Sequence, residues 1–576
     1  MNTKIINSIL LNVFLVILMG MTSCKKYLDY TPKGTVTAAD LATPTAADQL
    51  VIAAYASLGN SSWGNPIGSM WVWGSIRSDE AFKGGGAITD QGQYNQYEQY
   101  NLITTDMNQS DLQWNTLFAG VARANVALKA IDNLSVAEYP NKLERQAECR
   151  FIRGHFYFLL KELFKYVPYA DETVSTDSLP LVSNKEYSND SLWDKIADDF
   201  QFAAQNLPAN QSEVGRPTKY AAMAYQAKVR LYQAYMQDET NQVTSINTQD
   251  LEDVVALTDS VIQSGKYSLF PNYAENFTLE NENGQESIFA IQYSINDGTQ
   301  IGRVDMDDGL NYSVSTLYGC CSFHIPSQNM VNVFKTDATG LPELSTFNNT
   351  SLLTGSDFMT NGIDPRLDNT CAIPGHPFKN QPDVIFDSSW VRVPQIYGYH
   401  DCMKEILPAN SPGLEKVGPF FGSSKNIDIL RYDDVLLWRA EALIQLGQQD
   451  EALPLINDLR TRAANSPVKT ANGSNASNYR ISTYQPGVNC TWTQAYALKA
   501  LQFERRLEFG MEGTRFFDLV RWGIAAQTLN DYIAVEKTRF NFLQNALFTK
   551  ARDEYLPIPQ AEINLTHGLY VQNNGW

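Results

Sequence analysis

The segment Arg431–Ala464 reads RYDDVLLWRAEALIQLGQQDEALPLINDLRTRAA and carries the clearest fold signal in the chain. Apolar residues recur at helical spacing on both sides of Gly447, which marks a turn between two helices. Small and apolar residues stand where these helices would cross: Ala440, Leu443, Leu446, Ala452 and Leu455. We therefore predict two helices that pack against each other across the glycine turn.

Helical periodicity recurs through much of the remaining chain. The ranges that show it are Ala46–Leu58, Leu112–Leu134, Leu143–Val167, Ser191–Pro208, Thr218–Met236 and Asp250–Phe270. Successive helices with small residues at their crossings resemble tetratricopeptide repeats. The sequence thus predicts a mainly α-helical protein built from helix pairs, with the aromatic and leucine stripes in its core.

Residues 281–430 have a different character. Helical periodicity fades and Gly, Pro, Asn, Asp and Ser become frequent, which predicts a loop-rich insertion with short strands. Loops of this length in a compact protein usually carry function, so we expect the insertion to form part of a binding face. It separates an N-terminal helical part (41–280) from a C-terminal helical part (431–576), and we expect residues 24–576 to form one compact unit.

The N-terminus reads MNTKIINSILLNVFLVILMGMTSC. Lys4 precedes an apolar run, and small residues precede Cys24, as in a signal peptide rather than a membrane-spanning helix. The segment resembles the lipobox of a bacterial lipoprotein, with Met21 where Leu is usual. We predict a lipoprotein signal peptide over 1–23, a lipid anchor on Cys24 and a tether over 24–40; the alternative is a secreted protein with an incidental cysteine.

The chain is acidic, with a formal net charge of −19 over 576 residues. An acidic field repels phosphate backbones, which argues against nucleic acid as a partner. Aromatic residues make up 11% of the chain, which suits a carbohydrate- or peptide-facing surface but also a large aromatic core.

The sequence contains no catalytic signature: no nucleotide-binding glycine loop, no H-E-x-x-H and no G-x-S-x-G. His155 lies in an aromatic helical pattern and is expected in the core. The stretch DMDDG (Asp305–Gly309) resembles a calcium loop, but its glycine comes one residue early, so we expect a solvated acidic turn, with a structural calcium ion as the alternative. No carboxylate pair for glycoside hydrolysis stands out. We predict neither an enzyme nor a cofactor nor a metal site.

A zone of aromatic and polar residues runs from Trp63 to Tyr100. Sugar rings present flat C–H faces that aromatic rings can cover, and hydroxyls that Asp, Asn and Arg side chains can bind. The candidate ligand-binding residues in this zone are Trp71, Trp73, Arg77, Asp79, Tyr94 and Tyr97. The alternative is that the tryptophans pack in the core and that the tyrosines form one face of an amphipathic helix.

Two tryptophans stand one residue apart in SMWVWGSIRSDEAFKGGG (Ser69–Gly86). On a helix, Trp71 and Trp73 would lie about 200° apart, so one can pack inward while the other faces outward. We predict a helix end with Trp71 in the core and Trp73 exposed near Arg77 and Asp79. The glycines that follow would then lead the chain into the binding loops.

The insertion supplies further candidates in NYSVSTLYGCCSFHIP (Asn311–Pro326). Tyr318 is one. Cys320 and Cys321 are adjacent, and they form either a strained disulfide that offers a rigid apolar platform or two buried free thiols.

The last candidates lie in SSWVRVPQIYGYH (Ser388–His400), where alternation predicts a strand with Trp390, Arg392 and Pro394 on one face. The candidates from this segment are Trp390, Arg392 and Tyr397.

Several motifs occur together in a characteristic order. After the cysteine comes CKKYLDYTPKG, then the helix pairs, then DPRL (Asp364–Leu367), ERRLEFGMEGTRFFDLVRWG (Glu504–Gly523) and YLPIPQAEINLTHGLYVQNNGW (Tyr555–Trp576). This combination resembles the SusD/RagB family of Bacteroidetes outer-membrane lipoproteins over essentially the whole mature chain. The resemblance implies a helical SusD-like fold whose loops form a binding face.

The resemblance also implies a function. Such proteins sit on the cell surface, capture a nutrient, usually an oligosaccharide, and act as a lid over a SusC-like TonB-dependent transporter. The alternatives are a peptide-binding protein of the same fold, a lipid-anchored glycosidase, and a helical scaffold that binds only proteins.

The charged residues of the C-terminal motif alternate in sign, which indicates a stabilising network rather than a site. They are Glu504, Arg505, Arg506, Glu508, Glu512, Arg515, Asp518 and Arg521. Asp364 and Arg366 of DPRL similarly indicate a turn with a salt bridge.

Overall fold

Paired α-helices form the framework of the protein in the computed structural model, which describes residues 3, 42–59, 64, 66–300 and 302–576. The signal peptide predicted over 1–23 lies outside the described residues apart from residue 3, as do Cys24 and the tether over 24–40. Every range predicted as helical contains a helix. The long helices are α4 (Pro44–Leu58), α6 (Asn108–Asp132), α7 (Lys142–Phe164), α8 (Asn189–Asn206), α9 (Lys219–Ala234), α10 (Thr248–Gln263), α15 (Tyr432–Gln445), α16 (Gln449–Ala464), α17 (Gln494–Phe509) and α19 (Ala525–Glu536).

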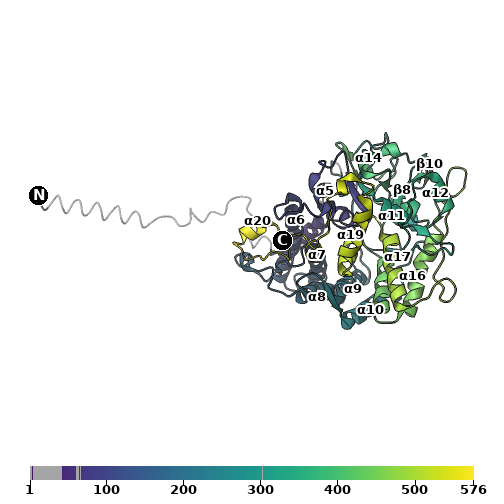
Figure 1. The fold of residues 1–576 in the computed structure, drawn as a ribbon. Helices are drawn as coiled ribbons and strands as arrows, with labels where there is room; N and C mark the ends of the chain where they lie inside the picture. Colours follow the sequence, from purple (N-terminus) through teal and green to yellow (C-terminus); the bar gives the residue numbers. More distant parts are fainter. Residues whose placement is uncertain (1–2, 4–41, 60–63, 65, 301) are drawn as a thin grey trace.

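Helices that follow one another in the chain pack side by side from α6 to α10 (Figure 1). Helix α15 then packs on α10 and on α16. Small residues allow the close crossings. A Cβ atom on Gly120 would lie 2.3 Å from the Phe156 ring, and one on Gly154 would lie 2.9 Å from the Phe200 ring. The predicted mainly α fold of helix pairs is therefore confirmed.

The segment between α10 and α15 carries short helices and short strands. Throughout the described part of the chain, each strand belongs to a two-stranded antiparallel pair. The pairs are β1 (Ala81–Gly84) with β5 (Phe323–Pro326), β2 (Tyr235–Gln237) with β3 (Val243–Ile246), β4 (Ser287–Ile291) with β14 (Ile427–Arg431), β6 (Lys335–Thr336) with β7 (Gly362–Ile363), β8 (Cys371–Ala372) with β11 (Asp401–Cys402), β9 (Pro377–Phe378) with β10 (Gln381–Ile385), and β12 (Leu414–Val417) with β13 (Phe420–Ser423). The short helices are α5 (Gly92–Gln99), α11 (Gln328–Asn332), α12 (Gly355–Thr360), α13 (Leu367–Thr370), α14 (Pro394–Tyr397), α18 (Arg515–Arg521) and α20 (Gln560–Leu565). Within the described ranges, no helix has both the length and the apolar character needed to cross a membrane.

A buried charge network fastens the insertion to the C-terminal helices. Arg366 lies 2.8 Å from Asp364, 2.8 Å from Glu504 and 2.9 Å from Glu508, measured between charged atoms, and these side chains are all essentially inaccessible to water. Arg460 pairs with the same Glu504 at 3.0 Å. The predicted salt bridge of DPRL and the predicted stabilising network are both confirmed.

We expect Arg366→Met to destabilise the protein by about 3–5 kcal/mol, because three carboxylates would stay buried beside an uncharged side chain. Urea unfolding followed by circular dichroism measures the change. Arg123→Met is the matched control, since Arg123 is exposed, and its effect should stay below about 1 kcal/mol. Equal effects of the two substitutions would contradict the role given to Arg366.

Candidate functional site

An open cleft of about 530 Å³ lies where the N-terminal part meets the insertion. Its volume falls within the range of about 300–1,000 Å³ that is typical of small-ligand sites. The residues that line it are Gly86, Ala87, Thr89, Asp90, Gln91, Leu310, Cys320, Cys321, Phe323, Arg392 and Phe420. We call it the Arg392 cleft.

The β1–β5 pair positions one wall of the cleft. Gly84 ends β1 with φ +79°, and a Cβ atom there would come within 2.4 Å of the Ser322 carbonyl oxygen, so the tight exit from the strand requires glycine. Lys83 then holds the loop that follows: its Nζ donates to the carbonyl oxygens of Gly84 (2.8 Å), Ala87 (2.8 Å) and Asp90 (2.6 Å). Gly84 to Gly86 thus lead the chain into a loop that lines the cleft, but they follow the strand β1 and not the predicted helix end.

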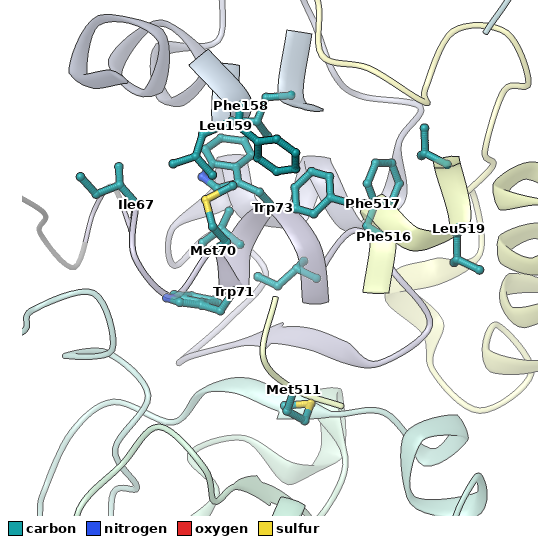
Figure 2. Close-up of a cluster of buried hydrophobic side chains, with 14 of the residues drawn as sticks. Ile67, Met70, Trp71, Trp73, Phe158, Leu159, Met511, Phe516, Phe517 and Leu519 are labelled. Carbon is teal, nitrogen blue, oxygen red and sulfur yellow. The ribbon is translucent and has the colours of Figure 1, made fainter. Parts of the chain in front are cut away.

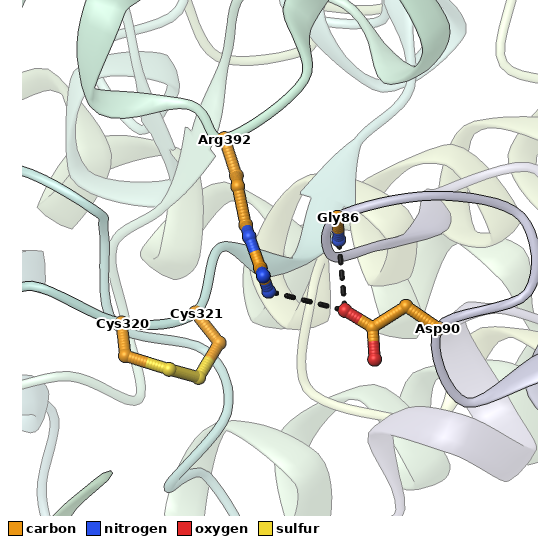
Figure 3. The surroundings of a disulfide bond; sticks show 5 residues. All are labelled: Gly86, Asp90, Cys320, Cys321 and Arg392. Atoms are coloured by element: carbon orange, nitrogen blue, oxygen red, sulfur yellow. Dashed lines mark hydrogen bonds and ion pairs between the residues drawn. A yellow bond between two sulfur atoms is a disulfide. The ribbon is translucent and has the colours of Figure 1, made fainter. Parts of the chain in front are cut away.

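An ion pair joins the two sides of the cleft (Figure 3). Arg392 Nη1 lies 3.1 Å from Asp90 Oδ2, which also accepts a hydrogen bond from the Gly86 amide at 2.9 Å. The side chains of Arg392 and Asp90 remain 45% and 32% exposed, so both polar groups are accessible to a ligand. A guanidinium has five N–H donors in one plane, which leaves Arg392 donors for ligand oxygens beyond the bond to Asp90.

Cys320 and Cys321 form a disulfide beside Arg392, which settles the two alternatives in favour of the disulfide (Figure 3). Cys320 is partly exposed and Cys321 is buried. Together with Leu310 and Phe420, the sulfur atoms give the cleft an apolar surface next to its polar pair.

Trp71 and Trp73 do not divide between core and surface, so the prediction that Trp73 is exposed is wrong. Both side chains are fully buried (Figure 2), within a π-helical turn, η1 (Trp71–Ser75). The turn is surrounded by α18, β1 and β5, and a Cβ atom on Gly74 would overlap the backbone of Gly513. Because no side of the turn faces water, the helical separation of the two rings cannot expose either one.

The other candidates of the first zone are also buried. Arg77 lies over the Phe516 ring, 4.0 Å from its centroid, and donates to the Asp553 carbonyl oxygen at 3.0 Å. Tyr94 packs edge-on against Trp71 and Tyr97 against Trp73, with centroids 5.6 and 5.0 Å apart. Tyr94 and Tyr97 pack in the core, in line with the packing alternative, whereas the burial of Arg77 contradicts its prediction as a ligand-binding residue.

Asp79 forms ion pairs with Arg506 (3.2 Å) and Arg515 (2.9 Å) inside the protein. Although burial raises the pKa of Asp79, the two guanidinium groups outweigh it and hold the pKa at about 2. This carboxylate is thus part of the buried charge network and is not available to a ligand.

In the second zone, the predicted strand over Ser388–His400 is wrong. Ser388–Trp390 forms a 3-10 turn, and Pro394 begins α14, where its missing N–H costs nothing. Trp390 is partly exposed but packs edge-on against Phe378 and Phe386. Only Arg392 of this segment lines the cleft.

Two tyrosines of the insertion are buried. The Tyr318 hydroxyl donates to the Leu407 carbonyl oxygen at 2.8 Å, and Tyr397 packs against Phe542 with centroids 5.2 Å apart. Neither ring lines the cleft.

The acidic stretch Asp305–Gly309 is also buried, contrary to the solvated turn predicted for it. Asp307 accepts hydrogen bonds from the amides of Gly68 (2.6 Å) and Ser69 (3.1 Å), which ties the stretch to the chain before η1. Burial raises the pKa values of Asp305 and Asp308 well above their usual range. In the part of the chain that the structure describes, no group of His, Cys, Asp or Glu side chains is arranged to hold a metal ion.

The sequence candidates that the structure brings together at the cleft are Arg392, Cys320 and Cys321. Sequence reasoning missed Asp90 and Phe420, which also line it. The run GGGAITDQ (Gly84–Gln91) held a usable signal, since glycines followed by polar residues often form exposed loops, but nothing in the sequence connects it with Arg392.

The fold and the cleft define a class: a protein of paired helices whose loops form an open cleft. The model described as "SusD family" matches residues 285–576, and the model described as "Starch-binding associating with outer membrane" matches residues 26–231. The chain belongs to the SusD/RagB family.

Similar proteins span the whole chain. SusD-like protein P25 of Formosa agariphila is 21% identical, and the match covers 99% of both chains. A SusD homologue from Bacteroides thetaiotaomicron has a solved structure with TM-score 0.69 and 19% identity, covering 94% of this chain and 99% of that one. The structure of surface glycan-binding protein A from the same species, in complex with laminarihexaose, has TM-score 0.63 and 21% identity, covering 92% and 100%.

We expect Asp90→Ala to loosen the loop over residues 84–91. The substitution removes the acceptor of the Gly86 amide and the partner of Arg392, so amide exchange in the loop should become roughly five-fold faster, as for one lost hydrogen bond of about 1 kcal/mol. Hydrogen–deuterium exchange with mass spectrometry measures it. Ile88→Ala, an exposed position in the same loop, is the control. Unchanged exchange in the Asp90 variant would show that the ion pair does not order the loop.

Glu80 lies beside Asp79 and gives a pH prediction. It is buried, and desolvation raises its pKa from 4.5 to about 7 despite nearby Arg506 and Arg515. Between these values the folded protein binds a proton that the unfolded chain has lost, so the free energy of unfolding falls as the pH rises.

Glu80→Gln, which resembles the protonated acid, should therefore weaken the loss of stability between about pH 4.5 and pH 7. Urea midpoints at pH 5 and pH 7.5 for both proteins test this. Glu186→Gln at an exposed position should leave the pH dependence as in the wild type. A pH dependence that Glu80→Gln does not change would mean that Glu80 is ionised in the folded protein.

Proposed function

We propose that this protein is a cell-surface glycan-binding lipoprotein that captures oligosaccharides in the Arg392 cleft. The observation that carries the proposal is the composition of the cleft: an accessible guanidinium and carboxylate stand next to an apolar surface of disulfide and Phe420. The polar pair suits sugar hydroxyls and the apolar surface suits the C–H face of a ring. A family relative has been solved with laminarihexaose, which supports an oligosaccharide as the ligand class.

The cleft favours binding over hydrolysis. Glycosidases use two carboxyl groups about 5–10 Å apart on either side of the scissile bond. Asp90 is the one acidic residue among those that line the cleft, and its carboxylate is already paired with Arg392. We therefore propose capture without cleavage.

We further propose that the captured glycan passes to a SusC-like TonB-dependent transporter, over which the protein acts as a lid at the outer membrane. The predicted lipid anchor on Cys24 would keep the protein at the membrane surface. The description of the family model over residues 26–231, starch-binding associating with the outer membrane, supports this location.

Arg392→Ala should weaken glycan binding at least about ten-fold, because charge-assisted hydrogen bonds contribute about 1.5–3 kcal/mol. A panel of polysaccharides including laminarin and starch, screened by affinity electrophoresis and followed by calorimetry, would identify the ligand and measure the change. Arg123→Ala, at an exposed position, is the matched control.

The proposal fails if the wild-type protein binds none of the glycans but binds peptides from a mixed library. Release of shorter sugars during incubation would instead show a glycosidase.

A further inference from the structure

A second cavity, of about 310 Å³, lies where the end of the N-terminal part meets the insertion and shares no lining residue with the Arg392 cleft. Its walls come from two 3-10 turns at 273–281, from Asn369 of α13, from the turn between β9 and β10, and from the segment Met403 to Pro412. We call it the amide pocket, because side-chain amides supply most of its polar groups. They belong to Asn369, Asn380, Gln381 and Asn410.

The four amides are held in two pairs. Asn380 Nδ2 donates to Asn369 Oδ1 at 3.0 Å, and Gln381 Nε2 donates to Asn410 Oδ1 at 3.1 Å. Within the described chain, no further hydrogen bond is made by Asn410 Nδ2, Asn380 Oδ1 or Gln381 Oε1. Asn380 and Asn410 are exposed and Gln381 is partly exposed, so the rim of the pocket presents to solvent a donor and acceptors that make no bond within the protein.

The backbone of the β9–β10 turn sets this arrangement. Lys379 and Asn380 have φ values of +52° and +55°, as a two-residue hairpin turn of the mirror-image type requires. Asparagine tolerates this conformation, whereas lysine rarely adopts it. Lys379 Nζ donates to the Met403 carbonyl oxygen at 2.5 Å, which ties the turn to the facing wall.

The lining of the pocket holds few charged groups. Lys379 is the one basic residue that lines it, and burial lowers the pKa of this ammonium group to about 7. The one acidic residue in the lining is the exposed Glu280. Apolar side chains supply much of the rest: Phe277, Leu279, Met403, Leu407, Pro408 and Pro412.

We propose that the amide pocket is a second binding site, for one neutral sugar unit or a polyol of similar size. Each hydroxyl of such a ligand both donates and accepts, which matches amides that present both functions side by side. The C–H groups of the ligand would face the apolar wall. The volume is at the lower end of the range for small-ligand sites, which suits a single ring rather than a chain of several.

Saturation-transfer NMR with the methyl glycosides of glucose, galactose and mannose tests the proposal. At least one of them should receive saturation from the wild-type protein and should still receive it from Arg392→Ala, in which the contribution of the other cleft is removed. Combined with Arg392→Ala, Asn410→Trp places an indole at the pocket and should abolish the remaining signal. Lys550→Trp, at an exposed position elsewhere, is the control and should keep it.

Asn380→Gly provides a second variant whose folding is not in question, because glycine adopts positive φ without a steric penalty. It removes one free acceptor and should reduce the signal roughly five-fold, as for one lost hydrogen bond. The proposal is overturned if none of the glycosides receives saturation, or if neither pocket variant changes the signal.

It is also overturned if Arg392→Ala alone abolishes the signal, which would place the glycosides in the Arg392 cleft. A triglycine probe whose signal depends on Asn410, with none from the glycosides, would make the pocket a peptide site. Because the Arg392 variant reports on the proposed glycan cleft and the Asn410 variant on the pocket, failure of either idea can be recognised separately.

Discussion

Arg366 brings the insertion and the C-terminal helices together through carboxylates that water does not reach. Its partners Glu504 and Glu508 both lie on α17, while Asp364 lies two residues before it in the insertion. Taking these charges out of water is costly, and the cost is offset only when every partner is in place. The network therefore holds the insertion against α17, and Arg460 of α16 shares the partner Glu504. This attachment matters because, in the described part of the insertion, the strands form two-stranded pairs, which are weak in isolation.

The position of the Arg392 cleft follows from this anchoring and from the buried turn η1. Trp71 and Trp73 fill the space between α18 and the β1–β5 pair, so the aromatic side chains fix where β1 begins. β1 carries Lys83, whose ammonium group holds the loop that presents Asp90. Trp71 and Trp73, which were expected to contact a ligand, thus act indirectly: they position the loop over residues 84–91, which lines the cleft. Their burial also explains why substitution of either tryptophan would disturb folding as well as binding.

The sequence predicted the framework well because helix periodicity is a local signal. Both helices of Arg431–Ala464 and the long N-terminal helices form where apolar spacing placed them. The candidate site was harder to predict, because its main polar contact joins Asp90 to Arg392. These residues lie far apart in the chain, and no local sequence pattern indicates that they are in contact. The disulfide was foreseeable as one of two states because its cysteines are adjacent. Trp73 was misplaced because aromatic and polar interleaving identifies a loop-rich zone but not which rings the rest of the chain covers.

The two cavities differ in the way that their residues are held. In the Arg392 cleft, an ion pair bridges separate segments and leaves its own atoms exposed to exchange partners with a ligand. In the amide pocket, the amides are paired within the wall and a strained turn is tied down by Lys379. A hydrogen bond also links the walls of the two cavities. Tyr318, two residues before the disulfide, donates to the carbonyl oxygen of Leu407, which lines the amide pocket. Rigid helix pairs thus carry an insertion whose binding chemistry can change through a few loop residues, since neither cavity draws its polar groups from the long helices.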